Sequence, residues 1–81
     1  MMRARVTITL KSGVLDPQGK AIQGALSSLG FSGVEEVRQG KVIDIALADT
    51  DAAAARERLN AMCEKLLANS VIENYAIELQ S

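Results

Sequence analysis

The sequence predicts a small α+β domain in which two helices alternate with the strands of an antiparallel sheet. Hydrophobic residues alternate with polar ones in stretches typical of strands, and they recur at helical spacing in the two segments between. The pair Asp16-Pro17 marks the start of the first helix, because an N-cap carboxylate accepts from free amides and proline at N1 has none. The predicted order is strand, helix, strand, strand, helix, strand. Two crossovers over an antiparallel sheet give the ferredoxin-like split βαβ arrangement, with both helices on one face.

The first strand and helix are the clearest elements. Residues 3–11 place their apolar side chains on one side and their polar ones on the other, as in a half-buried strand. The first helix should run from about Pro17 to residue 28 or 29 and end at a left-handed Gly30, with Phe31 placed to pack on Leu26. The helix also contains Gly19 and Gly24, which lower its stability and suggest close approach of a neighbouring backbone.

The second half of the chain predicts a hairpin, a helix and a final strand. Residues 34–38 and 41–47 surround a Gln-Gly pair and indicate a hairpin, with a bulge in its first strand. Asp51 is the expected N-cap of the second helix, which should end near Ala68 with Asn69 in the left-handed conformation. Residues 71–79 form the expected last strand. Because both helices should cover one face, the partly apolar opposite face is expected to attract a second copy or another subunit.

Composition excludes several functions. The 81 residues suffice for one domain, 1–81, whose small core is commonly supplemented by oligomerisation. One cysteine and no histidine exclude a disulfide, a Cys-His nucleophile pair and a histidine-ligated metal site, and a lone thiol fits a reducing cytoplasm. A net charge of −1 and only two aromatic rings argue against nucleic acid. No run approaches a membrane span, and we expect no signal peptide.

The chemically interesting side chains also have ordinary structural explanations. Asp16 is expected to cap its helix, although the same helix start could bind an anion with help from Lys11 or Lys20. Cys63 lies in the apolar stripe of the second helix and is expected to be a buried structural thiol. The two positive charges of Arg38 and Lys41 suit an acidic partner surface, and an exposed charged turn explains them equally well.

Three stretches of sequence resemble one family. Residues 10–19, residues 37–41, and residues 63–69 with residues 71–75 are similar to the small PurS-type subunit of phosphoribosylformylglycinamidine (FGAM) synthase, from de novo purine biosynthesis. The similarity covers nearly the whole chain in order. Asn74 departs from the aspartate expected before the tyrosine.

The resemblance implies a role in an assembly. Such subunits join a large synthetase subunit and a glutaminase subunit, which use ATP, Mg and glutamine-derived ammonia to convert formylglycinamide ribonucleotide to FGAM. The small subunit contributes no catalytic residue, binds no cofactor or metal of its own, supports assembly and ammonia transfer, and forms homodimers. Contact with the partners is then expected at loops and strand ends, at Lys11, Ser12, Asp16, Gln18, Arg38 and Lys41.

Other proteins share the predicted order of elements. The main alternative is an amino-acid-sensing regulatory domain, which has an Asp-Pro-Gly-like turn at the first crossover; here Gln18 interrupts that turn. An acylphosphatase-like enzyme needs an arginine in the first loop, which residues 11–16 do not supply. An RNA-recognition domain needs stacking rings on its central strands, and these are also missing.

Overall fold

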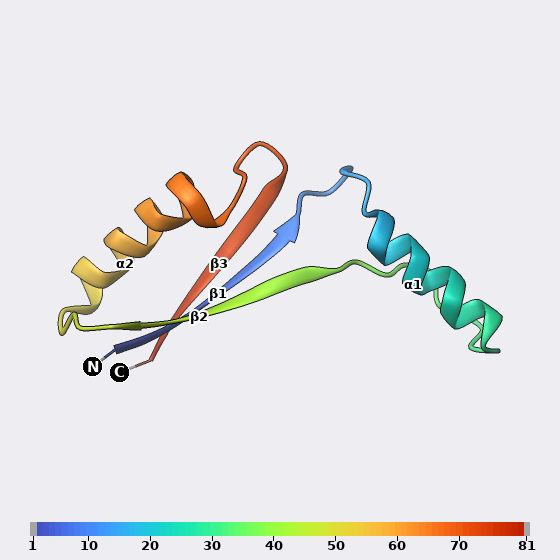
Figure 1. Cartoon of the computed structure of the whole chain (residues 1–81), viewed down its shortest axis with the longest axis horizontal. Coiled ribbons are helices and arrows are strands. Elements are labelled where there is room, and N and C mark those ends of the chain that lie inside the picture. The colour runs from blue at the N-terminus through green and yellow to red at the C-terminus, as the bar shows by residue number, and fades with distance from the viewer. Residues whose placement is uncertain (1, 81) are drawn as a thin grey trace.

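The computed structural model describes residues 2–80, which form a three-stranded antiparallel sheet and two helices (Figure 1). The elements in order are β1 (Met2–Leu10), α1 (Pro17–Ser28), β2 (Gly40–Leu47), α2 (Ala52–Met62), a π-helical turn η1 (Cys63–Leu67) and β3 (Glu73–Gln80). The strands lie in the order β2-β1-β3, and β1 pairs antiparallel with both neighbours. The predicted α+β class with an antiparallel sheet is confirmed.

The core lies between the sheet and α2. Alternate residues of β1 point inward, and four of them are buried, as their period-two spacing predicts: Met2, Ala4, Val6 and Ile8. Ala55 and Leu59 of α2 and Cys63 of η1 are fully buried against the sheet. Ile45 and Ile77 pack against this core from β2 and β3. This sheet with α2 and η1 is called the body below.

Helix α2 begins as predicted and ends differently. The Asp51 side chain caps it by accepting from the Ala53 amide at 3.0 Å. After η1 the chain turns at Asn69, which does not have the predicted left-handed conformation, since every positive φ in residues 2–80 belongs to a glycine. Instead, the Asn69 carbonyl accepts from the amides of Ile72 (3.0 Å) and Glu73 (2.7 Å). This turn delays β3 to Glu73, two residues later than predicted.

Helix α1 does not cover the sheet, so the prediction of two helices on one face is wrong. It lies beyond the end of β1, at the far end of an elongated molecule of 49 × 25 × 15 Å (Figure 1). The radius of gyration is 16.2 Å, whereas a compact chain of this length has about 12 Å. We call residues 11–39, which carry α1 and the chain that returns from it, the arm.

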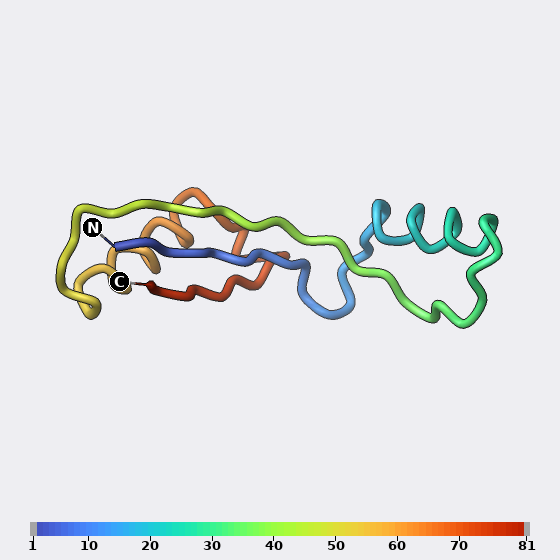
Figure 2. The backbone as a smooth tube through the Cα atoms, turned by 90° about the horizontal axis from the view of Figure 1, so that it is seen from below, coloured from blue at the N-terminus to red at the C-terminus, as the bar shows by residue number. Residues whose placement is uncertain are grey.

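The predicted hairpin is also wrong. Residues 31–39 form no strand, and the chain continues through Gln39 and Gly40 into β2 without reversing (Figure 2). The physical reason is that α1 holds the returning chain: the Gln23 amide donates to the carbonyls of Val34 (3.4 Å) and Glu35 (3.0 Å). Residues 34–38 therefore lie along α1 and not beside β2.

The end of α1 matches the prediction. Gly30 has φ +94°, its amide donates to the Ser27 carbonyl at 3.1 Å, and the Phe31 amide donates to the Leu26 carbonyl at 3.0 Å. These two bonds define a Schellman motif, which satisfies carbonyls at the end of the helix. The Phe31 side chain itself stays 59% exposed.

The two glycines inside α1 differ in their surroundings. A Cβ atom added at Gly19 would collide with the Val37 carbonyl oxygen, so the predicted close backbone approach is confirmed there. A Cβ atom added at Gly24 would meet nothing within 4 Å.

Substituting these two glycines should therefore change stability in opposite directions. Gly19→Ala should destabilise the arm by about 1–3 kcal/mol through overpacking against Val37. Gly24→Ala should stabilise the helix by about 0.5–1 kcal/mol, because alanine is the better helix former. Urea denaturation followed by circular dichroism measures both, and equal gains from both substitutions would contradict the close approach.

Candidate functional site

All six predicted contact residues lie within two short segments that meet where the arm leaves the body. We call these segments, residues 11–18 and 38–41, the neck. They adjoin a cavity of about 270 Å³ between the end of β1 and the start of β2. The residues around it are Ile8, Leu10, Asp16, Gln18, Gln39, Gly40, Lys41 and Glu73. Arg38, in the second segment, reaches the first segment through its guanidinium. The structure thus gathers positions that are more than 20 residues apart in the chain.

Asp16 is buried in the neck and joins its two segments. Its carboxylate accepts from the Gln39 amide at 2.6 Å and from the Gly19 amide at 2.9 Å. Only 5% of the residue is exposed. These two backbone hydrogen bonds, the one from Gln39 first, hold the pKa of the Asp16 carboxyl below its ordinary value. The capping prediction is confirmed, and because the carboxylate occupies the amides of the helix start, anion binding there is disfavoured.

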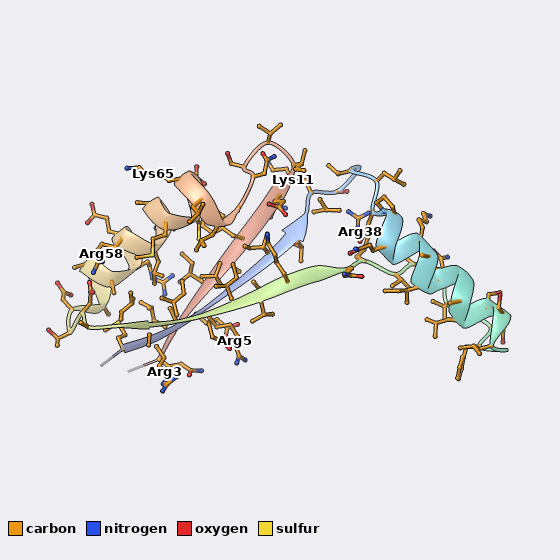
Figure 3. All side chains as sticks on the ribbon, viewed as in Figure 1. Arg3, Arg5, Lys11, Arg38, Arg58 and Lys65 are labelled. Atoms are coloured by element: carbon orange, nitrogen blue, oxygen red, sulfur yellow. The ribbon has the colours of Figure 1, made fainter. Side chains whose placement is uncertain are left out.

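Arg38 braces the same junction. Its guanidinium donates to the Val14 carbonyl at 2.9 Å and to the Lys11 carbonyl at 3.2 Å. Figure 3 shows Arg38 beside the start of α1. The Lys11 amide in turn donates to the Ile72 carbonyl at 2.8 Å, which ties the neck to the turn before β3. Arg38 therefore forms hydrogen bonds within its own chain, whereas the sequence predicted a free charge at the tip of a hairpin.

The side chains left for a partner are those that remain exposed in the neck. Ser12, Gln18 and Lys41 are exposed, and Lys11 is half-buried. The sequence interpretation missed Gln39, whose side-chain amide donates to the Gln18 side-chain oxygen at 2.6 Å. No local pattern marks Gln39, because its importance comes from its contact with Asp16 across the neck.

The remaining reactive groups are held in structural settings. Cys63 is fully buried, and burial raises the pKa of its thiol, so the nucleophilic thiolate is disfavoured. Asp44 pairs with Arg5 at 2.9 Å on the open face of the sheet, and this hydrogen bond lowers the pKa of the Asp44 carboxyl. Between residues 2 and 80, no three His, Cys, Asp or Glu side chains cluster in a way that could hold a metal ion.

That open face is more polar than predicted. It carries the charged side chains of the Arg5–Asp44 pair among smaller apolar ones such as Ala46 and Ala76. Val42 is the large apolar side chain exposed on this face, and most of the others lie on the arm and around η1, as Leu15, Leu29, Phe31, Leu66 and Val71 show. Within the described chain, no helix has the length and apolar character needed to cross a membrane.

Removing the Asp16 carboxylate should loosen the neck. Asp16→Ala should lower the unfolding temperature by several degrees at pH 7, with Asp16→Asn between it and the unmodified chain. Because the folded pKa lies below the unfolded one, the stability from this carboxylate is present above the unfolded pKa and lost as the pH falls through the folded pKa. Thermal unfolding measured between about pH 6 and pH 2 should show a smaller fall in unfolding temperature with acid for Asp16→Ala than for the unmodified chain. An unchanged pH dependence would contradict the role of Asp16.

Comparison with known proteins places this arrangement in a family. The family model PurS, described as phosphoribosylformylglycinamidine (FGAM) synthase, matches residues 3–81. The PurS subunit of that synthase from Synechocystis is 49% identical over 75 residues, which cover 93% of this chain and 75% of the relative. The one from Methanocaldococcus jannaschii is 46% identical over 80 residues, 99% of this chain and 96% of the relative.

Solved structures agree over the whole chain. The crystal structure of M. jannaschii PurS, one of the subunits of formylglycinamide ribonucleotide amidotransferase, superposes with a TM-score of 0.91 at 46% identity, covering 100% of this chain and 98% of that one. A chain of the PurLQS structure from Thermotoga maritima superposes with a TM-score of 0.85 at 28% identity, covering 99% of each chain. The neck and the arm are included in these full-length matches. The chain belongs to the PurS family of FGAM synthase subunits.

Proposed function

We propose that this chain is a non-catalytic subunit of FGAM synthase that holds a large synthetase subunit and a glutaminase subunit together. The observation that carries the proposal is the full-length match to a chain of the T. maritima PurLQS structure, together with relatives named as the PurS subunit of the synthase. The complex converts formylglycinamide ribonucleotide to FGAM with ATP and glutamine-derived ammonia.

The residues of the chain support a positioning role. The sequence has no histidine, its one thiol is buried, and the Asp16 carboxylate is occupied by backbone amides. Ammonia transfer requires two active sites held in register and shielded from water, and a rigid small subunit supplies that geometry without reacting groups. ATP and Mg are then used by the synthetase subunit.

The neck is the contact region we assign to the partners. Ser12, Gln18 and Lys41 are exposed there on a framework fixed by Asp16 and Arg38. A fixed framework lowers the entropic cost of ordering an interface. Lys11 is half-buried at the same junction and contributes at its edge.

The chain also associates with itself in this proposal, as a homodimer or a higher oligomer. Several large apolar side chains on the arm and around η1 are exposed in the single chain. Exposed apolar surface of this kind favours association with another protein surface. We place the complex in the cytoplasm, where the lone Cys63 would stay reduced. The amino-acid-sensing alternative is not favoured, since the relatives found are PurS subunits.

Reconstitution tests the assembly role. The chain alone should show neither synthase nor glutaminase activity, and adding it to the other two subunits should restore glutamine-dependent formation of FGAM. Formation of FGAM from added ammonium should depend far less on this chain, because free ammonia reaches the synthetase site without transfer from the glutaminase site. Equal glutamine-dependent rates with and without the chain would contradict the proposal.

The contact region can be tested with one reversed charge. Lys41→Glu should raise the concentration of this chain needed for half-maximal glutamine-dependent activity by about tenfold, as loss of a good interface contact does. The matched control is Glu57→Lys, which reverses an exposed charge on α2, away from the neck. Equal effects of the two substitutions would exclude Lys41 from the interface.

A further inference from the structure

The neck cavity has an apolar floor between two side chains of opposite charge. Its floor is formed by Ile8, which is buried, and Leu10, which is half-buried. Lys41 lies directly opposite Ile8 in the β1–β2 ladder, and Glu73 lies directly opposite Leu10 in the β1–β3 ladder. Because residues directly opposite in a ladder project to the same face, Lys41 and Glu73 flank the floor from its two sides.

The cavity opens to solvent. Figures 1 and 2 show α2 over the part of the sheet farther from the neck and α1 beyond the end of β1. Gln18 and Lys41, which line the cavity, are both exposed. A side chain of another protein can therefore enter the cavity between them and reach its floor.

The unused hydrogen-bonding groups on the Lys41 side of the cavity are donors. The Asp16 carboxylate is already occupied by the amides of Gln39 and Gly19. The Gln18 side-chain oxygen accepts from the Gln39 side chain at 2.6 Å, which leaves the Gln18 NH2 group to donate. Within residues 2–80 neither this NH2 group nor the Lys41 ammonium donates to another residue. Two such donors, one of them cationic, fit an anionic acceptor.

Glu73 determines the side on which an anion binds. Its carboxylate accepts from the Asn69 amide at 2.6 Å, which holds it at the β3 side of the cavity. It forms no ion pair with Lys41 in the described chain, so the Lys41 charge stays available. Since like charges repel, an incoming anion is directed away from Glu73 and toward Lys41.

The apolar floor favours an acidic side chain over an inorganic anion. Glutamate and aspartate carry their carboxylate on methylene groups, which gain from contact with Ile8 and Leu10. Phosphate and sulfate have no apolar part to place there. Glutamate, with two methylenes, covers more of the floor than aspartate does. The hydrogen bond from the Gln39 amide to Asp16 holds this rim in place before binding, which lowers the cost of ordering it.

We propose that the neck cavity receives an acidic side chain, of glutamate length, from the synthetase or the glutaminase subunit. Its carboxylate binds the Lys41 ammonium and the Gln18 NH2 group, and its methylenes pack on Ile8 and Leu10. The inference rests on the proposed function and names the partner chemistry that the neck recognises.

The substitution Gln18→Glu tests the cavity separately from the rest of the neck. The new carboxylate still accepts from Gln39, so the unfolding temperature should stay unchanged, but it repels an incoming carboxylate. The concentration of this chain needed for half-maximal glutamine-dependent activity should rise about tenfold. Asn74→Asp makes the same chemical change at an exposed position on the open face and should leave that concentration unchanged. If Lys41→Glu weakens the complex and Gln18→Glu does not, the cavity is not the binding site, and the proposed function still stands.

Carbodiimide cross-linking of the reconstituted complex identifies the occupant, because the reagent joins a lysine amine directly to a carboxylate in contact with it. Mass spectrometry should find Lys41 joined to a glutamate or aspartate of the synthetase or glutaminase subunit. Lys41→Arg keeps the charge but lacks the amine and should lose this link. Replacing the linked acid with lysine should restore the activity of Lys41→Glu. Links from Lys41 only to other copies of this chain, or no link in a complex that is active, would overturn the proposal.

Discussion

The buried Asp16 carboxylate is the contact on which the arrangement of this chain depends. It accepts from the first turn of α1 and from Gln39 at 2.6 Å, so one side chain both starts the helix and fastens the returning chain to it. That second bond acts together with the Gln23 bonds to Val34 and Glu35, which hold the returning chain beside α1 and away from β2. Arg38 strengthens the same junction from the other side through two backbone carbonyls. The elongated shape therefore follows from a few directional hydrogen bonds at the neck, not from the packing of a core.

The contrast between a packed body and an exposed arm fits a subunit that positions other proteins. The body buries its apolar side chains between the sheet and α2, and the burial of this apolar surface stabilises it. The arm buries little apolar surface and leaves several large apolar side chains exposed. This exposure lowers the stability of a monomer, and association with a partner that covers these side chains would stabilise the folded chain. The chain belongs to the PurS family, whose named relatives are subunits of FGAM synthase, so association with other subunits is expected for it.

The sequence was sufficient for features set by neighbouring residues and insufficient for those set across the chain. Both N-caps, the Schellman end of α1 and the inward faces of the strands follow from local spacing, and the structure has them. The prediction of a hairpin at Gln39-Gly40 was wrong. The chain path there depends on the hydrogen bond between Asp16 and Gln39, which are 23 positions apart, and local spacing does not reveal such a contact. Gln18 and Lys41 were named from the sequence as contacts at a loop and a strand end, whereas their position around one cavity with Gln39 and Glu73 required the structure.

The central claim is that the Asp16 hydrogen bonds set the direction of the arm, and a distance between arm and body tests it directly. Spin labels placed at Ser28 and Ala53 in a Cys63→Ala background, diluted with unlabelled chains, report that distance within one chain by double electron–electron resonance. The account predicts one narrow distance distribution, which broadens markedly in Asp16→Ala. An equally narrow distribution at the same distance in that variant would contradict it.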